Sequence, residues 1–153
     1  MGIAYRCDPT TRIGIEVWHG NVGLDVARLH VEQLAKDPDW TASRRIITDL
    51  TGLAQESRPS PEQIRRLSDA FLQQLAYLVT DAKWSIVADR AFAEALVFGE
   101  QVRHEVRRMI VFTNLVSACV WLGIDRAEVE PVIKELRREI RAEPADREGP
   151  SPR

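Results

Sequence analysis

The sequence has 153 residues, of which 44% are hydrophobic and 29% charged, and its formal net charge is −2. This length suits one domain with a sizeable core, and the near balance of 21 basic and 23 acidic side chains argues against a nucleic-acid partner. Two distant cysteines, Cys7 and Cys119, and the lack of a long apolar stretch fit a soluble, cytoplasmic protein without a transmembrane segment.

The first third of the chain predicts a hairpin, a helix and a strand. Residues 3–7 and 13–18 flank a turn-forming DPTT segment, and apolar residues alternate along the second run. Apolar side chains at helical spacing indicate a helix over residues 24–35, which Pro38 is expected to end. The apolar run at residues 45–50 predicts the next strand.

The middle of the chain continues this alternation. The segment SPEQ at residues 60–63 has the pattern of a capping box and predicts a helix that ends near Val79. Residues 84–89 predict a fourth strand. A helix is expected over residues 91–106, apolar around much of its circumference, and Gly99 in its middle indicates close packing or a break.

The last part of the chain predicts one more strand and two helices. Residues 108–113 form the strand, and a short helix follows that an asparagine caps and Gly123 closes. The DRAE motif offers a second capping box for a C-terminal helix over residues 125–141, which Pro131 is expected to bend or restart. Residues 142–153 have the composition of a disordered tail.

The alternation of strands and helices indicates the fold class. Helices between strands carry the chain back to the same edge of the sheet, and the continuous apolar runs IIT, SIVA and MIVF are typical of strands covered on both faces. We therefore predict one α/β domain over residues 1–141, with a mixed, largely parallel five-stranded sheet that begins with a hairpin and carries an extra C-terminal helix.

The sequence lacks the usual motifs for metal binding, nucleophilic catalysis, phosphate binding and dinucleotide binding. The histidines His19, His30 and His104 have no metal-ligand spacing, and no nucleophile elbow, P-loop or dinucleotide-binding glycine pattern is present. We expect no metal, no cofactor and no catalytic residue. The four tryptophans and the apolar segment 92–102 suit a core, and they also suit a site for a lipid or other apolar small molecule, or contact with a second subunit.

Several short motifs resemble those of a known family. A strand that ends in DLTGL at residues 49–53 and a later FTNLVSACVWLG resemble the STAS-domain fold of anti-sigma-factor antagonists. The sequence is more similar to small bacterial SpoIIAA-like proteins, which are also likened to the CRAL-TRIO lipid-transfer fold. The resemblance covers residues 3–123 and rests on these positions: Trp18, Gly20, Asp37, Pro38, Phe112, Ala118, Trp121, Leu122 and Gly123.

The resemblance implies a regulatory switch at particular hydroxyl groups. Antagonists of this family carry a DSSG at the next helix start, whose serine a partner kinase phosphorylates. The corresponding segment here reads ESRPSPEQ, in which Ser57 and Ser60 are neither preceded by aspartate nor followed by glycine. Thr51, Ser57 and Ser60 are therefore the candidate regulatory hydroxyls, although the motif itself is absent.

Without the resemblance, the residues of the DLTG stretch indicate the end of a buried strand. Ile46 and Ile47 would supply the core, Asp49 and Thr51 would satisfy backbone groups in the turn, and Gly52 would let the chain leave the sheet. A ligand rim at Asp49 is the alternative, since α/β folds place ligands at strand ends.

Three functions follow as hypotheses. The first is a non-catalytic STAS-like module that binds another protein or a second copy of itself. The second is a carrier or sensor of lipids or other apolar small molecules, as the CRAL-TRIO resemblance implies. The third is an enzyme with a convergent site near Asp49.

Overall fold

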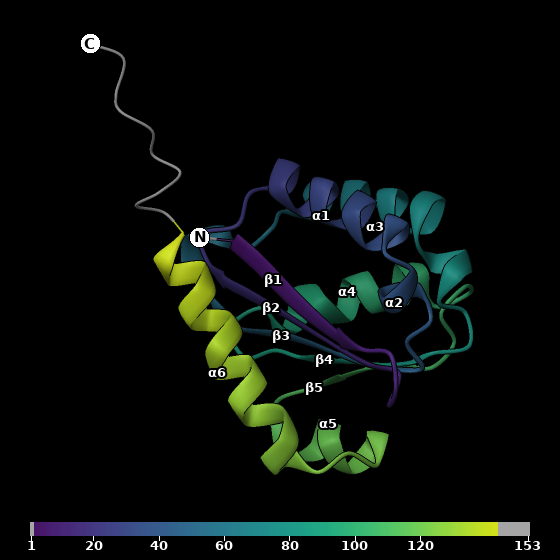
Figure 1. Cartoon of the computed structure of the whole chain (residues 1–153). Coiled ribbons are helices and arrows are strands. Elements are labelled where there is room, and N and C mark those ends of the chain that lie inside the picture. Colours follow the sequence, from purple (N-terminus) through teal and green to yellow (C-terminus); the bar gives the residue numbers. More distant parts are fainter. Residues whose placement is uncertain (1, 144–153) are drawn as a thin grey trace.

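A five-stranded sheet forms the centre of the computed structural model, which describes residues 2–143 (Figure 1). Residues 144–153, most of the predicted tail, lie outside the described residues. The strands, in their order across the sheet, are β1 (Gly2–Asp8), β2 (Ile13–Gly20), β3 (Arg45–Leu53), β4 (Lys83–Val87) and β5 (Met109–Phe112). Only the β1–β2 hairpin is antiparallel, so the predicted mixed, mostly parallel sheet is confirmed.

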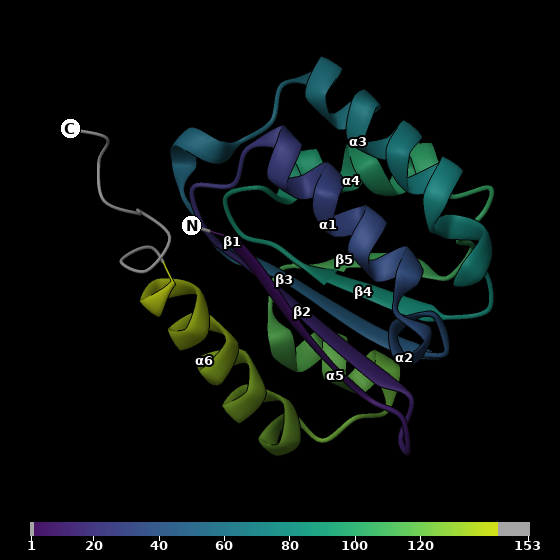
Figure 2. The same ribbon diagram turned by 45° about the horizontal axis from the view of Figure 1, so that its top comes forward.

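Helices cover both faces of this sheet (Figure 2). The helices are α1 (Leu24–Lys36), α2 (Pro38–Thr41), α3 (Pro61–Gln74), α4 (Phe92–Val102), α5 (Leu115–Leu122) and α6 (Arg126–Ala142). Helices α1, α3 and α4 each connect one parallel strand to the next, and crossovers of one hand place all three on the same face. Helices α5 and α6 follow the last strand and cover the other face. No helix among the described residues is long and apolar enough to cross a bilayer.

The sheet separates two apolar layers. Ile46 packs with Leu34 and Leu75 beneath α1, α3 and α4, whereas its neighbour Ile47 packs with Leu136 and Ile140 beneath α5 and α6. Successive side chains of a strand point to opposite faces, so a strand covered twice needs apolar residues at every position. The continuous apolar run at Ile46 and Ile47 therefore reflects burial on both faces, and both residues are fully buried.

The strand that contains the DLTG stretch is longer than predicted. β3 continues through Gly52 to Leu53, and these residues pair with His19 and Gly20 of β2, so the expectation that Gly52 lets the chain leave the sheet is wrong. A side chain at Gly52 would place its Cβ 2.4 Å from His19 Nδ1. Gly52 is required here because an imidazole ring lies against its Cα.

Two expected helix features also differ. The α-helix α3 ends at Gln74, before the predicted Val79, because Leu75 has φ −124° and starts a 3₁₀ turn that buries Leu75 and Ala76. Gly99 neither breaks α4 nor packs closely, since the nearest atom to an added Cβ is Val111 Cγ2 at 4.0 Å.

Helix α6 runs through its proline without interruption. Pro131 lacks the N–H that would bond to the carbonyl of Ala127, and Ala127 is exposed, so water can satisfy that oxygen. Of the bend or restart expected at Pro131, the restart is therefore wrong. Asp125 caps the helix through the N–H of Ala127, while no hydrogen bond from the Glu128 side chain completes a capping box in the part of the chain that the structure describes. In contrast, the predicted box of Ser60 and Gln63 is formed.

Candidate functional site

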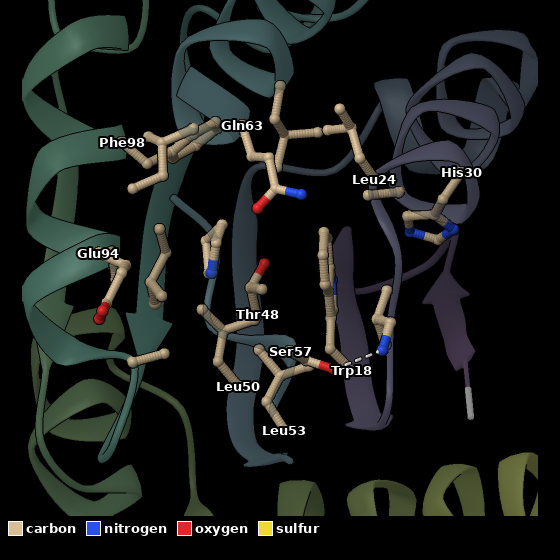
Figure 3. Close-up of a pocket in the computed structure, with 18 of the residues that line it drawn as sticks. Trp18, Leu24, His30, Thr48, Leu50, Leu53, Ser57, Gln63, Glu94 and Phe98 are labelled. Carbon is tan, nitrogen blue, oxygen red and sulfur yellow. Dashed lines mark hydrogen bonds between the residues drawn. The ribbon is translucent and has the colours of Figure 1, made fainter. Parts of the chain in front are cut away.

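A cavity of about 230 Å³ lies between the sheet and helices α1, α3 and α4. Its mouth is at the carboxyl ends of β2, β3 and β4, where the segments 21–23, 54–60 and 88–91 leave the sheet. Figure 3 shows Leu24 and His30 entering from α1, Thr48 and Leu50 from β3, and Phe98 from α4. This is the edge at which parallel α/β sheets usually bind ligands.

Aromatic rings form much of the cavity wall. The ring centroid of Phe71 lies 5.3 Å from that of Trp84 and 5.4 Å from that of Phe98, in edge-to-face arrangements. Trp18 lines the same cavity, and its ring meets that of His30 edge-on. Such walls are suited to flat or aliphatic apolar molecules.

A chain of buried polar groups crosses the floor of this cavity. Trp84 Nε1–H donates to Thr48 Oγ1 at 2.8 Å, and the Thr48 hydroxyl donates to Glu16 Oε1 at 2.7 Å. The other carboxylate oxygen, Glu16 Oε2, lies 2.6 Å from His30 Nε2. All four side chains line the cavity and each is at least 95% buried.

Adjacent strands bring these groups together. Glu16 of β2 is the register partner of Thr48 of β3, and both side chains point to the face that α1, α3 and α4 cover. His30 lies on the buried face of α1, among Ala27, Val31 and Leu34. Burying polar groups in an apolar layer costs free energy unless they form hydrogen bonds with one another. The core therefore depends on these hydrogen bonds.

Two cavity-lining residues keep a buried polar atom without a partner among residues 2–143. These atoms are Trp18 Nε1, a donor, and Glu94 Oε2, an acceptor. The second oxygen of Glu94 accepts from Arg58 Nε and Nη2 at 2.9 and 2.7 Å. Unpaired groups of this kind are unusual inside proteins.

Ser57 and Ser60, two of the predicted hydroxyls, lie on the segment at the cavity mouth. Ser57 lines the mouth, where its hydroxyl accepts from the N–H of Val22 at 2.8 Å and donates to Asn21 Oδ1 at 2.5 Å. Ser60 is exposed and caps α3 through the N–H of Gln63. Both hydroxyls therefore hold local structure.

Asp49 and Thr51, the other two predicted residues, lie on the opposite face of the sheet. Asp49 is 3% exposed and accepts from Arg137 Nη2 of α6 at 2.5 Å and from the Thr51 hydroxyl at 2.6 Å. Arg137 Nη2 also lies 2.8 Å from Thr51 Oγ1. The structure thus separates the predicted set into two pairs, and this pair attaches α6 to the sheet.

Burial and neighbouring charges shift several side-chain pKa values around these sites. Desolvation, followed by the positive charges of Arg141 and Arg137, lowers the pKa of His19. Burial, with Asp37 and Asp39 nearby, raises the pKa of the Cys7 thiol to about 12. No three His, Cys, Asp or Glu side chains among residues 2–143 are arranged to hold a metal ion.

The polar chain in the cavity was not predicted from the sequence. A weak signal was present, because Glu16 alternates in phase with Trp18 and His30 falls three residues after Ala27 on the apolar stripe of its helix. Both positions face the core, yet a single glutamate or histidine in such a pattern does not reveal its partner.

Comparison with known proteins adds no family to these observations. No family model matches the chain, and no curated protein matches it closely enough to be a relative.

Proposed function

We propose that this protein binds one small, mostly apolar molecule in the cavity between the sheet and helices α1, α3 and α4. The observation that carries the proposal is the cavity itself, which has aromatic walls, a few converging polar groups and a mouth at the strand ends. Concave, mostly apolar pockets with a few polar groups are the usual form of small-molecule sites. This proposal agrees with what the CRAL-TRIO resemblance implies.

The volume limits the size of the ligand. An apolar cavity of about 150 Å³ takes benzene, and sites for drug-sized molecules begin at about 300 Å³. At about 230 Å³, this cavity suits a bicyclic aromatic molecule or an aliphatic chain of similar bulk. A long acyl chain would have to extend through the mouth.

Filling the cavity tests the proposal. Ala95 of α4 lines the cavity and is 4% exposed, so Ala95→Leu places extra methyl groups in the space that a ligand would occupy. Ala93→Leu is the matched control, because Ala93 lies exposed on the same helix. The probe is 2-methoxynaphthalene, titrated into ¹⁵N-labelled protein. The indole N–H signals of Trp18 and Trp84 report on the cavity, and that of Trp121 on the opposite face is an internal reference.

We expect the probe to shift the Trp18 and Trp84 signals and leave that of Trp121 in place. Ala95→Leu should weaken binding at least tenfold while the protein keeps its thermal midpoint, and Ala93→Leu should leave binding unchanged. Native mass spectrometry of freshly purified protein adds a test for a ligand acquired in the cell. The absence of any probe-induced shift or bound mass would refute the proposal.

A STAS-like regulatory role is the second proposal. The accessible position of Ser60 and the place of Ser57 beside the cavity mouth support it, since a partner kinase could reach this segment. Phosphosite mass spectrometry tests it, and absence of phosphate on Thr51, Ser57 and Ser60 in cells would count against it. Catalysis at Asp49 has less support, because Arg137 and Thr51 already occupy its carboxylate.

A further inference from the structure

The outer edge of β5 is unpaired in the part of the chain that the structure describes. β5 is the last strand of the sheet, and its hydrogen-bonded neighbour there is β4 alone (Figure 1). The carbonyl groups of Arg108 and Phe112 accept hydrogen bonds from main-chain N–H groups on the β4 side. Main-chain groups of successive residues point to opposite sides of a strand, so Met109, Val111 and Thr113 direct their N–H and C=O groups away from β4.

The composition of β5 does not protect this edge. Edge strands of natural proteins commonly carry charged residues, proline or a bulge that discourages pairing with another chain. At the opposite edge of the sheet, β1 contains Arg6 and Asp8, and Arg6 forms ion pairs with Glu135 and Glu139 of α6. β5 reads MIVF, and its register with β4 is regular. The outer edge of β5 is therefore open to a further strand.

Apolar side chains flank this edge on both faces of the sheet. Ile110 is 40% exposed although it lies inside β5, on the face that α5 and α6 cover. On the other face, Val111 Cγ2 lies 4.0 Å from a Cβ built on Gly99, so this side of α4 borders the edge. Leu96, three residues before Gly99 on the same side of α4, is 48% exposed. An added strand would cover both exposed side chains.

A second copy of β5 fits this edge in one antiparallel register. With a two-fold axis at Val111, Val111 of each copy exchanges both main-chain hydrogen bonds with the other, and Met109 pairs with Thr113 of the second copy. Ile110 then lies opposite Phe112 of the second copy, at a closely spaced position where aromatic and β-branched side chains pack well. This register satisfies the outward main-chain groups and covers the exposed isoleucine.

Charges at the edge also favour an antiparallel second copy. Arg107 and Arg108 precede β5 and are exposed. The antiparallel register keeps the two copies of Arg108 about 20 Å apart, whereas parallel pairing would place them side by side. On the exposed side of α4, Glu100 and Arg103 form an ion pair at 3.3 Å, and this pair adds no net charge to the flank. Two copies of the edge can therefore meet without placing like charges opposite each other.

We propose that the protein forms a symmetric homodimer in which β5 pairs antiparallel with β5 of a second copy, so that the two sheets become one. The proposal does not depend on the cavity, whose mouth lies at β2, β3 and β4. β5 has only four residues, so the interface belongs to the small class, below about 1,200 Å² in total, and we expect a dissociation constant in the micromolar range.

Sedimentation velocity from about 1 to 300 µM tests the dimer. The wild type should shift from monomer to dimer across this range. Ile110→Lys places a charge opposite Phe112 of the second copy and should remain monomeric, with its thermal midpoint retained because residue 110 is partly exposed in the monomer. Leu96→Glu leaves the strand unchanged and should weaken the dimer at least fivefold. Leu29→Lys is the matched control, because Leu29 is 59% exposed on α1, and it should dimerise as the wild type does.

Amide hydrogen exchange of the ¹⁵N-labelled protein tests the register. At about 300 µM, the outward N–H groups of Met109, Val111 and Thr113 should exchange at least threefold more slowly in the wild type than in Ile110→Lys. The N–H of Phe112 points toward β4 and should exchange at similar rates in both proteins. The same alternation should appear in the wild type alone on dilution, which keeps the test valid if a variant fails to fold.

The possible results either support or overturn the homodimer. A wild type that is monomeric at every concentration overturns it. A dimer whose outward amides exchange as fast as those of the monomer uses another surface, and this result also overturns it. An equal loss of the dimer in Leu29→Lys would show that added positive charge, and not the β5 edge, controls association. None of these results affects the proposed binding of a small molecule, which the naphthalene titration tests separately.

Discussion

Thr48→Val is the most informative test of the buried polar chain, because valine keeps the shape of threonine and removes only its hydroxyl. That hydroxyl accepts from Trp84 Nε1 and donates to Glu16, and Thr48 is 5% exposed. The substitution therefore leaves one indole N–H and one carboxylate oxygen without their partner in a buried place. Each buried unpaired group costs about 1–3 kcal/mol, and a charged group costs more.

The added methyl group offsets part of this cost, by about 0.8 kcal/mol. We therefore expect Thr48→Val to lower the free energy of unfolding by about 2–4 kcal/mol. The measurement is urea unfolding at 25 °C, followed by tryptophan fluorescence, with an unchanged m value as the sign that both states are comparable. Thr10→Val, at an exposed turn position, is the control and should change stability by less than about 0.5 kcal/mol.

A double-mutant cycle separates the chain from general packing. Trp84→Phe removes the indole donor, so in that background Thr48→Val leaves only Glu16 without a partner. The cost of Thr48→Val should then fall by about 1 kcal/mol or more. Additive effects of the two substitutions, or a Thr48→Val protein as stable as the wild type, would show that these hydrogen bonds do not support the fold.

Three further predictions address other parts of the molecule. Gly99→Ala should raise the free energy of unfolding in urea by up to about 1 kcal/mol, because a Cβ has room at this position in the middle of a helix. Gly52→Ala should lower it, because a Cβ there would lie 2.4 Å from His19 Nδ1. The pKa of His19 is lowered in the folded protein, so the unfolded chain binds a proton more readily. The free energy of unfolding should therefore be highest above about pH 6.5 and decline as the pH falls below this value. His19→Asn should flatten this decline, and an equal decline in both proteins would contradict the lowered pKa. Cys7, with a pKa raised to about 12, should react with a thiol reagent at pH 8 far more slowly in the native protein than in urea, and fast native labelling would disagree with its burial.

Local pattern predicted most of the secondary structure, because helices and strands follow from the spacing of apolar residues along a few turns or pleats. Examples are the capping box of Ser60 and Gln63 and the helix closed by Gly123, whose φ is 69°. At one position where prediction failed, a distant neighbour decided the outcome. Gly52 was expected to end a strand, and instead β2 extends the pairing and places His19 over it.

The candidate site shows the same division more sharply. Composition and pattern determined an α/β domain with both sheet faces covered, and they identified Asp49 and the hydroxyls after it as the polar residues of interest. Only the tertiary structure decided that Asp49 faces Arg137 of α6 while Ser57 lies across the sheet at a cavity mouth. Glu16, His30 and Thr48 come from three separate elements, and a hydrogen bond depends on distance in space. No spacing in the sequence therefore reveals that these three side chains lie together on the floor of the cavity.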